Sequence, residues 1–228
     1  MITALATFVL LGQQELMVEE YFPLQPGIIR FYDEDFEHKG KRSKFTIIEK
    51  IIGSSELKRY EKYIDETELD PNLKEKIRPV IGEGIEVTTS VEGQTPASTF
   101  YKIDGRTVFI VGVEKGALLV NAYPIVSVGR NPETWVYSGP IDVMGAPAPA
   151  IIEGETKVIR DYKFNNKTYP AIEAKVKYTI NLEPAGIAES HQRAIYARGL
   201  GLVEYEETGK VGDNVTKRKR KLSRIQLP

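Results

Sequence analysis

Apolar and polar side chains alternate strictly along one stretch toward the end of the chain. From residue 172 to residue 182 every even position is apolar and every odd position is polar. A period of two puts one set of side chains against a core and the other in solvent, as in an antiparallel sheet. The apolar residues of 152–164 keep the same phase, and Asn165-Asn166 between the two stretches favours a turn. The sequence therefore predicts a β-hairpin over 151–182.

Shorter alternating stretches predict the rest of a meander. Asp104-Gly105 is typical of a two-residue hairpin turn, and Gly40 can supply the positive φ of a turn over 38–42. The run 139–149 is rich in Pro, Gly and Ala and is apolar, which predicts a rigid loop packed on the sheet. The predicted strands are 28–37, 43–52, 84–91, 98–103, 107–114, 118–128, 134–137, 194–207 and 215–227.

One segment has helical spacing instead. Leu57, Tyr60 and Ile64 recur at intervals of three and four residues after two serines that could cap a helix. Asp70-Pro71 then has the pattern of a second helix start. These signals predict a helical insertion at about 54–78.

The expected fold is mainly β, with one antiparallel domain over 16–228. A meander must hide one apolar face, and it can do so by curving as an open half-barrel around the helical insertion. A two-sheet β-sandwich is the alternative. An apolar fraction of 41% and a charged fraction of 28% are ordinary for a globular protein.

The N-terminal segment 2–12 contains no charge. It is too short to span a bilayer, which takes about 20 apolar residues, but it has the length of a signal-peptide core. We therefore expect a signal peptide or leader over 1–15, no transmembrane span, and a secreted or cell-envelope location. A first core strand or helix is the alternative interpretation of this segment.

Two distinctive segments stand near the ends of the chain. The first runs from Tyr21 to Gly27 (YFPLQPG) and the second from Tyr196 to Val203 (YARGLGLV). Together they resemble a group of uncharacterised bacterial secreted or envelope β-proteins that open on Tyr-[Phe/Tyr]-Pro-Leu-x-x-Gly and close on Tyr-Ala-x-Gly-[Val/Leu]-Gly-Leu-Val. The resemblance implies an exported β-protein and no catalytic residues. The half-barrel shape is also similar to bacterial lipoprotein carriers, as an analogy of fold only.

The chemistry that the sequence lacks excludes several classes of function. There is no Cys and there are only two His, so neither thiol catalysis nor the usual zinc sites can be assembled. No nucleophile elbow, phosphate loop or dinucleotide motif occurs. Ser190 and His191 are neighbours that would point to opposite faces of a strand. We expect no enzyme, no cofactor and no metal.

An acidic cluster follows the first segment. Asp33, Asp35 and Glu37 would share one strand face, where oxygen ligands could hold Ca²⁺. The turn-forming Gly of a calcium loop is missing. A solvated face near the basic turn at 38–42 is therefore the simpler interpretation.

A basic run lies close to the C-terminus, and the net charge of the whole chain is only −1. On a strand its charges would divide between two faces, and no aromatic residues are interleaved to stack bases, so no nucleic acid is expected. A terminal edge strand that Lys and Arg guard against edge-to-edge pairing is the preferred interpretation, and polyanion binding is the competitor. The run consists of Lys217, Arg218, Lys219, Arg220 and Lys221.

Two functions from different classes remain. The first is a non-enzymatic envelope protein whose concave face binds a lipid-like or other hydrophobic ligand. The second is a structural or interaction module that offers a sheet edge or face to an envelope protein. A cavity of roughly 300 Å³ or more would favour the first. The candidate ligand or packing residues are Tyr21, Phe22, Trp135, Tyr178 and Tyr196.

Overall fold

A computed structural model describes residues 16–63, 76–92, 94–114, 116–143 and 146–228. The described part is nearly all strand, with one short helix. Its elements are α1 (Val18–Tyr21), β1 (Ile29–His38), β2 (Lys41–Tyr63), β3 (Lys76–Val91), β4 (Ala97–Asp104), β5 (Thr107–Val113), β6 (Ala117–Ser127), β7 (Glu133–Val143), β8 (Ala146–Phe164), β9 (Lys167–Asn181), β10 (Ile187–Ala197), β11 (Gly201–Val211) and β12 (Asn214–Gln226).

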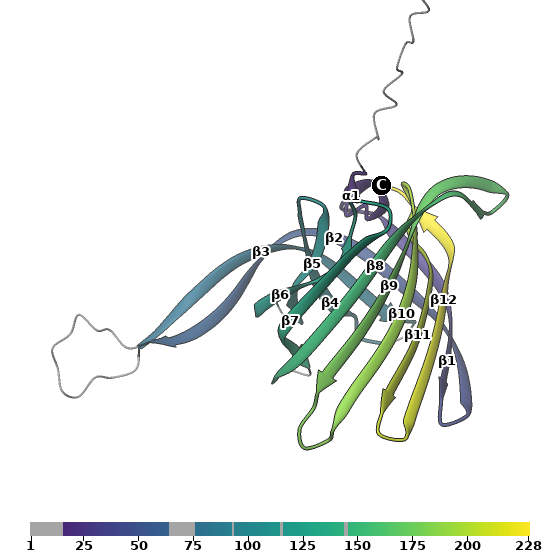
Figure 1. Cartoon of the computed structure of the whole chain (residues 1–228). Coiled ribbons are helices and arrows are strands. Elements are labelled where there is room, and N and C mark those ends of the chain that lie inside the picture. The colour runs from purple at the N-terminus through teal and green to yellow at the C-terminus, as the bar shows by residue number, and fades with distance from the viewer. Residues whose placement is uncertain (1–15, 64–75, 93, 115, 144–145) are drawn as a thin grey trace, which may run out of the picture.

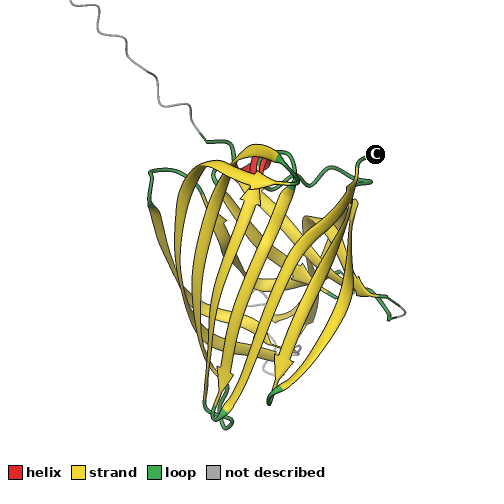
Figure 2. Cartoon of the chain, turned by 90° about the vertical axis from the view of Figure 1, so that its right-hand side faces the viewer, coloured by secondary structure: helices red, strands yellow, loops and turns green. Residues whose placement is uncertain are grey.

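The strands form one 12-stranded sheet in the order β3-β4-β5-β6-β2-β1-β12-β11-β10-β9-β8-β7. Almost all neighbours are antiparallel, which confirms the predicted meander. β3 also pairs with β2, and a single parallel bridge joins Lys58 of β2 to Ala117 of β6. The sheet therefore curves into a partial ring that does not close (Figures 1 and 2).

The hairpin predicted over 151–182 is present as β8 and β9. Asn165 and Asn166 take φ values of 47° and 61° at its turn, the positive values that a two-residue hairpin turn requires. On β9 the even positions Ala174 and Val176 are buried, and Lys175 between them is exposed. The alternation of the sequence thus gives the facing of this strand correctly.

The predicted helical insertion at 54–78 is wrong wherever the structure describes it. Residues 54–63 continue β2 and residues 76–78 begin β3, whereas 64–75 lie outside the described residues. Ser55 donates a hydrogen bond to Glu86 on the facing strand at 3.2 Å instead of capping a helix. Leu57 lies opposite Gly82 and is fully buried. Pairing with β3 and burial of Leu57 therefore outweigh the local helical spacing.

The helix that fills one end of the sheet is α1, which the sequence analysis did not predict. Val18 and Tyr21 are its buried residues. They belong to one buried cluster with Val108 and Val126 of β5 and β6 and with residues of β9 and β10 that include Ile172. A single helical turn thus joins the two walls of the curved sheet at this end (Figure 2).

The two distinctive segments of the sequence meet beside α1. The Gly199 amide donates to the Glu20 carbonyl at 2.7 Å, and the rings of Phe22 and Tyr196 lie 5.5 Å apart. A register shift between Ile195 and Tyr196 marks a bulge in the second segment. The two distinctive segments are therefore held together at this end of the sheet.

Arg30 fixes this junction. Its guanidinium donates to the Leu200 carbonyl and the Pro23 carbonyl, each at 2.8 Å, and pairs with Glu49 at 2.6 Å. Gly201 has a φ of +83°, and a Cβ there would lie 2.8 Å from the guanidinium. This glycine is needed both for its backbone conformation and for the close approach of Arg30.

The structure also differs from the prediction in two other regions. The stretch 194–207 divides into β10 and β11 at a turn over 198–200. The run 139–149 is not a loop packed on the sheet, because 139–143 end β7 and 146–149 begin β8, with direct pairing from Gly139↔Ala150 to Val143↔Ala146. Pro140 and Pro149 face each other in this hairpin. Among the described strands β7 pairs only with β8, so its other edge can accept Pro140, which has no amide proton, and Pro149 precedes the first residue of β8 that pairs with β9.

β12 is not an edge strand. It lies between β1 and β11, so the interpretation of the basic run as an edge guard is wrong. On its outward face Lys221, Lys219 and Lys217 lie opposite Asp33, Asp35 and Glu37 of β1. Lys219 also pairs with Glu206 of β11 at 3.0 Å. The basic strand is thus matched to acidic strands on both sides.

The inward face of the same pairing contains a buried carboxylate. Glu34 is 6% exposed and accepts hydrogen bonds from Arg220 at 2.7 Å, and Arg218 lies 3.4 Å from it. The Arg220 side chain is only 16% exposed, whereas that of Lys219 is 71% exposed. The charges of the basic run divide between two faces, and the inward arginines join β12 to β1.

Glu34→Gln should therefore destabilise the fold. It leaves Arg220 inside the sheet without the carboxylate that neutralises it and Arg218 with Glu207 alone, which should cost about 3 kcal/mol of unfolding free energy. Asp35→Asn is the matched control on the next residue, because its side chain is 64% exposed and 3.6 Å from Lys44. Asp35→Asn should change the unfolding free energy by no more than about 0.5 kcal/mol. Equal midpoints for the two variants in urea unfolding would contradict this account of the β1–β12 pairing.

Candidate functional site

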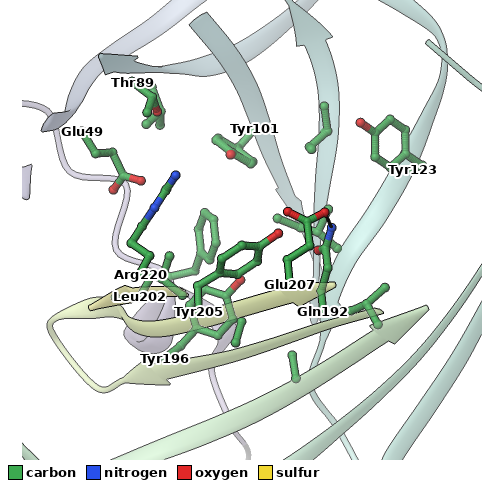
Figure 3. Close-up of a pocket in the computed structure, with 18 of the residues that line it drawn as sticks. Glu49, Thr89, Tyr101, Tyr123, Gln192, Tyr196, Leu202, Tyr205, Glu207 and Arg220 are labelled. Carbon is green, nitrogen blue, oxygen red and sulfur yellow. Dashed lines mark hydrogen bonds between the residues drawn. The ribbon is translucent and has the colours of Figure 1, made fainter. Parts of the chain in front are cut away.

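A cavity of about 590 Å³ lies inside the curved sheet. Residues of β1 to β7 and of β9 to β12 line it, and so do Phe22, Pro23 and Leu24, which follow α1. Figure 3 shows Glu49 and Arg220 on one side of this space and Tyr123 on the other, with Tyr205 and Glu207 between them. The volume falls within the range of roughly 300–1,000 Å³ typical of small-molecule sites.

The register of the sheet explains which side chains reach the cavity. Residues directly opposite each other on paired strands project from the same face, so each inward residue belongs to a row across the sheet. One row is Glu34, Arg220, Tyr205, Ala194 and Ala174, from β1, β12, β11, β10 and β9. The next row on the same strands is Phe36, Arg218, Glu207, Gln192 and Val176. Along both rows an arginine on β12 and a polar residue on β11 give way to an apolar residue on β9.

The cations of the polar wall are already matched. Arg220 is paired with Glu34, and its guanidinium lies 5.9 Å from the centre of the Tyr205 ring. Arg218 lies between Glu34 and Glu207, at 3.4 Å and 3.6 Å. Arg30 is paired with Glu49. These contacts leave no arginine of the cavity lining without a carboxylate beside it.

Glu207 is the centre of a small polar cluster. It accepts a hydrogen bond from the Ser190 hydroxyl at 2.8 Å and one from the Gln192 amide at 3.3 Å. Tyr205 donates a further hydrogen bond to the same carboxylate. The dashed contact in Figure 3 joins Gln192 to Glu207. The cluster fixes polar side chains from β10 and β11 at the wall of an otherwise apolar space.

The opposite wall is mostly apolar, although Thr89, Tyr101, Tyr123 and Asp142 also belong to it. Val87 of β3, Ile110 of β5, Ile125 of β6 and Ile141 of β7 line it, and Ile180 extends it along β9. The cavity therefore has one face suited to hydrocarbon and one suited to polar groups.

Tyrosine hydroxyls from five strands also reach the cavity. Burial raises the pKa of Tyr123 to about 12. Burial is also the main cause that raises the pKa of the four others well above the ordinary value of about 10. All five are therefore neutral phenols, able to donate a hydrogen bond, at physiological pH. They are Tyr101, Tyr123, Tyr178, Tyr196 and Tyr205.

The structure brings some of the predicted site residues together and leaves others apart. Phe22, Tyr178 and Tyr196 line the cavity, as do Arg218 and Arg220. Tyr21 is buried in the core beside α1. Trp135 does not line the cavity, although it projects from the same face as Val176; it packs over Gly154, where a Cβ would lie 2.0 Å from the indole. Lys217, Lys219 and Lys221 are on the outward face.

Several residues of the site were missed. Glu34 and Glu207 stand in charged stretches whose pattern does not show which strand neutralises them, although both occupy inward phases of their strands. In the sequence, Ser190 stands out only as a candidate nucleophile beside His191. It lines the cavity and bonds to Glu207, whereas His191 alternates to the other side of β10.

Within the described ranges no group of three or more metal-binding His, Cys, Asp or Glu occurs. None of the helices described is long and apolar enough to cross a membrane.

The shielding of the cavity phenols can be tested by titration. Because their pKa values are raised in the fold, Tyr178→Phe should not change the tyrosinate absorbance of the native protein at about pH 11. In urea at the same pH the variant should lose the absorbance of one tyrosine. The raised pKa contributes stability below pH about 10 that is lost as the pH rises above it. A variant that already absorbs less than wild type in the native state would contradict the burial of this phenol.

Comparison with known proteins gives distant structural neighbours only. No protein-family model matches the sequence, and no curated protein matches it. A provisionally assigned lipoprotein of Parabacteroides distasonis is 10% identical at a TM-score of 0.37, covering 90% of this chain and 98% of its own. A provisionally assigned exported protein with a YmcC-like fold from Bacteroides fragilis is 11% identical at a TM-score of 0.37, and the match covers 90% of this chain and 98% of that protein. The hypothetical lipoprotein YmcC of Escherichia coli is 7% identical at a TM-score of 0.34, and the match covers 92% of this chain and 99% of that protein. At these TM-scores the likeness carries no conclusion about this chain.

Proposed function

We propose that this chain is a non-enzymatic protein of the cell envelope that binds a lipid-like or other hydrophobic small molecule in its interior cavity. The observation that carries the proposal is the cavity itself, with a volume of about 590 Å³ and a mostly apolar wall. A sheet whose concave face served only as a scaffold would be expected to fill that face with side chains, since protein interiors are close-packed.

The lining favours binding over catalysis. No histidine lines the cavity, and its one serine donates to a carboxylate that also accepts from an amide and a phenol. Arg30 and Arg220 are hydrogen-bonded to carboxylates, and Arg218 lies within 3.6 Å of two carboxylates. Groups that are fixed in mutual contacts shape a site and orient a ligand, but they offer no free base next to a nucleophile.

The export of the protein rests on the sequence. The uncharged segment 2–12 has the pattern of a signal-peptide core, and the paired terminal segments resemble those of secreted or envelope proteins. Residues 1–15 lie outside the described residues, so the predicted leader stays a prediction.

An interaction module is the second candidate. The hairpin of β2 and β3 projects from the body of the sheet (Figure 1). Tyr60, Ile77 and Ile81 on this hairpin are 69%, 66% and 58% exposed. Exposed apolar side chains grouped on one projecting element are a common feature of protein-binding surfaces. The cavity is the larger and more specific feature, so binding of a small molecule is preferred.

Blocking the cavity provides the test. Thr89 of β3 lines the cavity and is half-buried, so Thr89→Trp should fill part of the space without removing a core side chain. Native mass spectrometry of protein purified from its own host should show wild type with a retained hydrophobic molecule and the variant without it.

Thr88→Trp is the matched control, because Thr88 projects from the other face of the same strand and does not line the cavity. It should retain the same added mass as wild type. Wild type that carries no added mass, and that binds no hydrophobic probe after purification, would overturn the proposal.

A further inference from the structure

We propose that the ligand of this cavity is an electrically neutral amphiphile whose polar part carries hydrogen-bond acceptor oxygens, such as the ester and hydroxyl oxygens of a monoacylglycerol. The inference rests on the proposed function and adds the chemistry of the head group. It is carried by two independent features of the lining, the matched charges of the polar wall and the free phenols that face it.

The charges of the lining exclude an ionic head group. The lining contains three arginines, Arg30, Arg218 and Arg220, and three acidic residues, Glu49, Asp142 and Glu207. Each arginine is within 3.6 Å of a carboxylate oxygen. An anionic head would find no free cation and would approach Glu49 and Glu207, whereas a cationic head would approach the arginines. Burying a charge without a partner is strongly unfavourable.

The phenols favour a head group that accepts hydrogen bonds. Tyr205 donates to Glu207, and Tyr101 has a hydrogen bond with Thr99. Among the described groups, the hydroxyls of Tyr123, Tyr178 and Tyr196 have no hydrogen-bond partner, and all three residues line the cavity. Burial keeps each phenol protonated, so each presents a donor to whatever occupies the space.

The geometry sets the orientation of such a molecule. Tyr178 projects from β9 between the apolar residues Val176 and Ile180, and Tyr196 projects from β10 beside Phe22, with the two rings 5.5 Å apart. A ligand can therefore place its oxygens against these phenols and its hydrocarbon against Ile110, Ile125 and Ile141. Donors within an apolar site fix the orientation of a ligand that is otherwise held by burial.

The test compares three probes with the same twelve-carbon tail on the full chain: monododecanoylglycerol, dodecanoate and dodecyltrimethylammonium. Isothermal titration below the micelle concentration of each probe should give a Kd for the glycerol ester at least about tenfold lower than for either ion. Equal or tighter binding of dodecanoate, or of the cationic probe, would overturn the inference while leaving the proposed function intact. Failure of all three to bind would overturn the proposed function itself.

Removal of the phenols gives a second, independent measurement. Tyr178→Phe and Tyr196→Phe keep the ring and remove the donor, and each should weaken binding of the glycerol ester by about three- to tenfold, the value of one neutral hydrogen bond. Tyr60→Phe, on the exposed face of the β2–β3 hairpin, should leave it unchanged. Unchanged affinity in both cavity variants, at unchanged melting temperature, would overturn the role of the phenols.

Discussion

The pairing of the first strand with the last is the interaction on which the rest of this structure depends. β1 and β12 join the part of the sheet that holds β2 to β6 to the part that holds β7 to β11. Over residues 33–37 of β1 their contact is electrostatic on both faces, with the outward Asp35 opposite Lys219 and the inward Glu34 bonded to Arg220. An exposed pair contributes little, but a buried carboxylate held by two guanidinium groups strongly disfavours any register that separates them.

The same pairing creates the polar wall of the cavity. Because directly opposite residues share a face, seating Arg218 and Arg220 against Glu34 also aligns them with Tyr205 and Glu207 on β11. The β1–β12 pairing therefore makes this wall polar, and because it pairs arginines with carboxylates it also leaves the wall without net charge. A ligand that enters this space meets charged groups that are already paired with one another. It also meets phenol hydroxyls that have no hydrogen-bond partner. The chemistry of the site follows from the way in which the sheet is joined.

Much of the sheet could be predicted from local pattern. The alternation along 172–182 gave the facing of β9, and Asn165-Asn166 and Asp104-Gly105 gave two turns, because side-chain period and turn chemistry are local properties. The helix expected at 54–78 was wrong because pairing of β2 with β3 is not visible in the spacing of Leu57 and Tyr60. The edge assigned to 217–221 was wrong because the acidic partner of the basic run lies at the other end of the chain. The polar residues of the cavity were missed for the same reason, since Glu207 and Glu34 acquire their roles only through long-range register.

Amide hydrogen exchange along β12 tests the central claim most directly. A strand with neighbours on both sides has every amide in the ladder, so the amides of residues 217–221 should all exchange slowly and at similar rates. A strand paired on one side only would show slow and fast amides in alternation. Uniform protection would support the seating of β12 between β1 and β11, and an alternating pattern would contradict it.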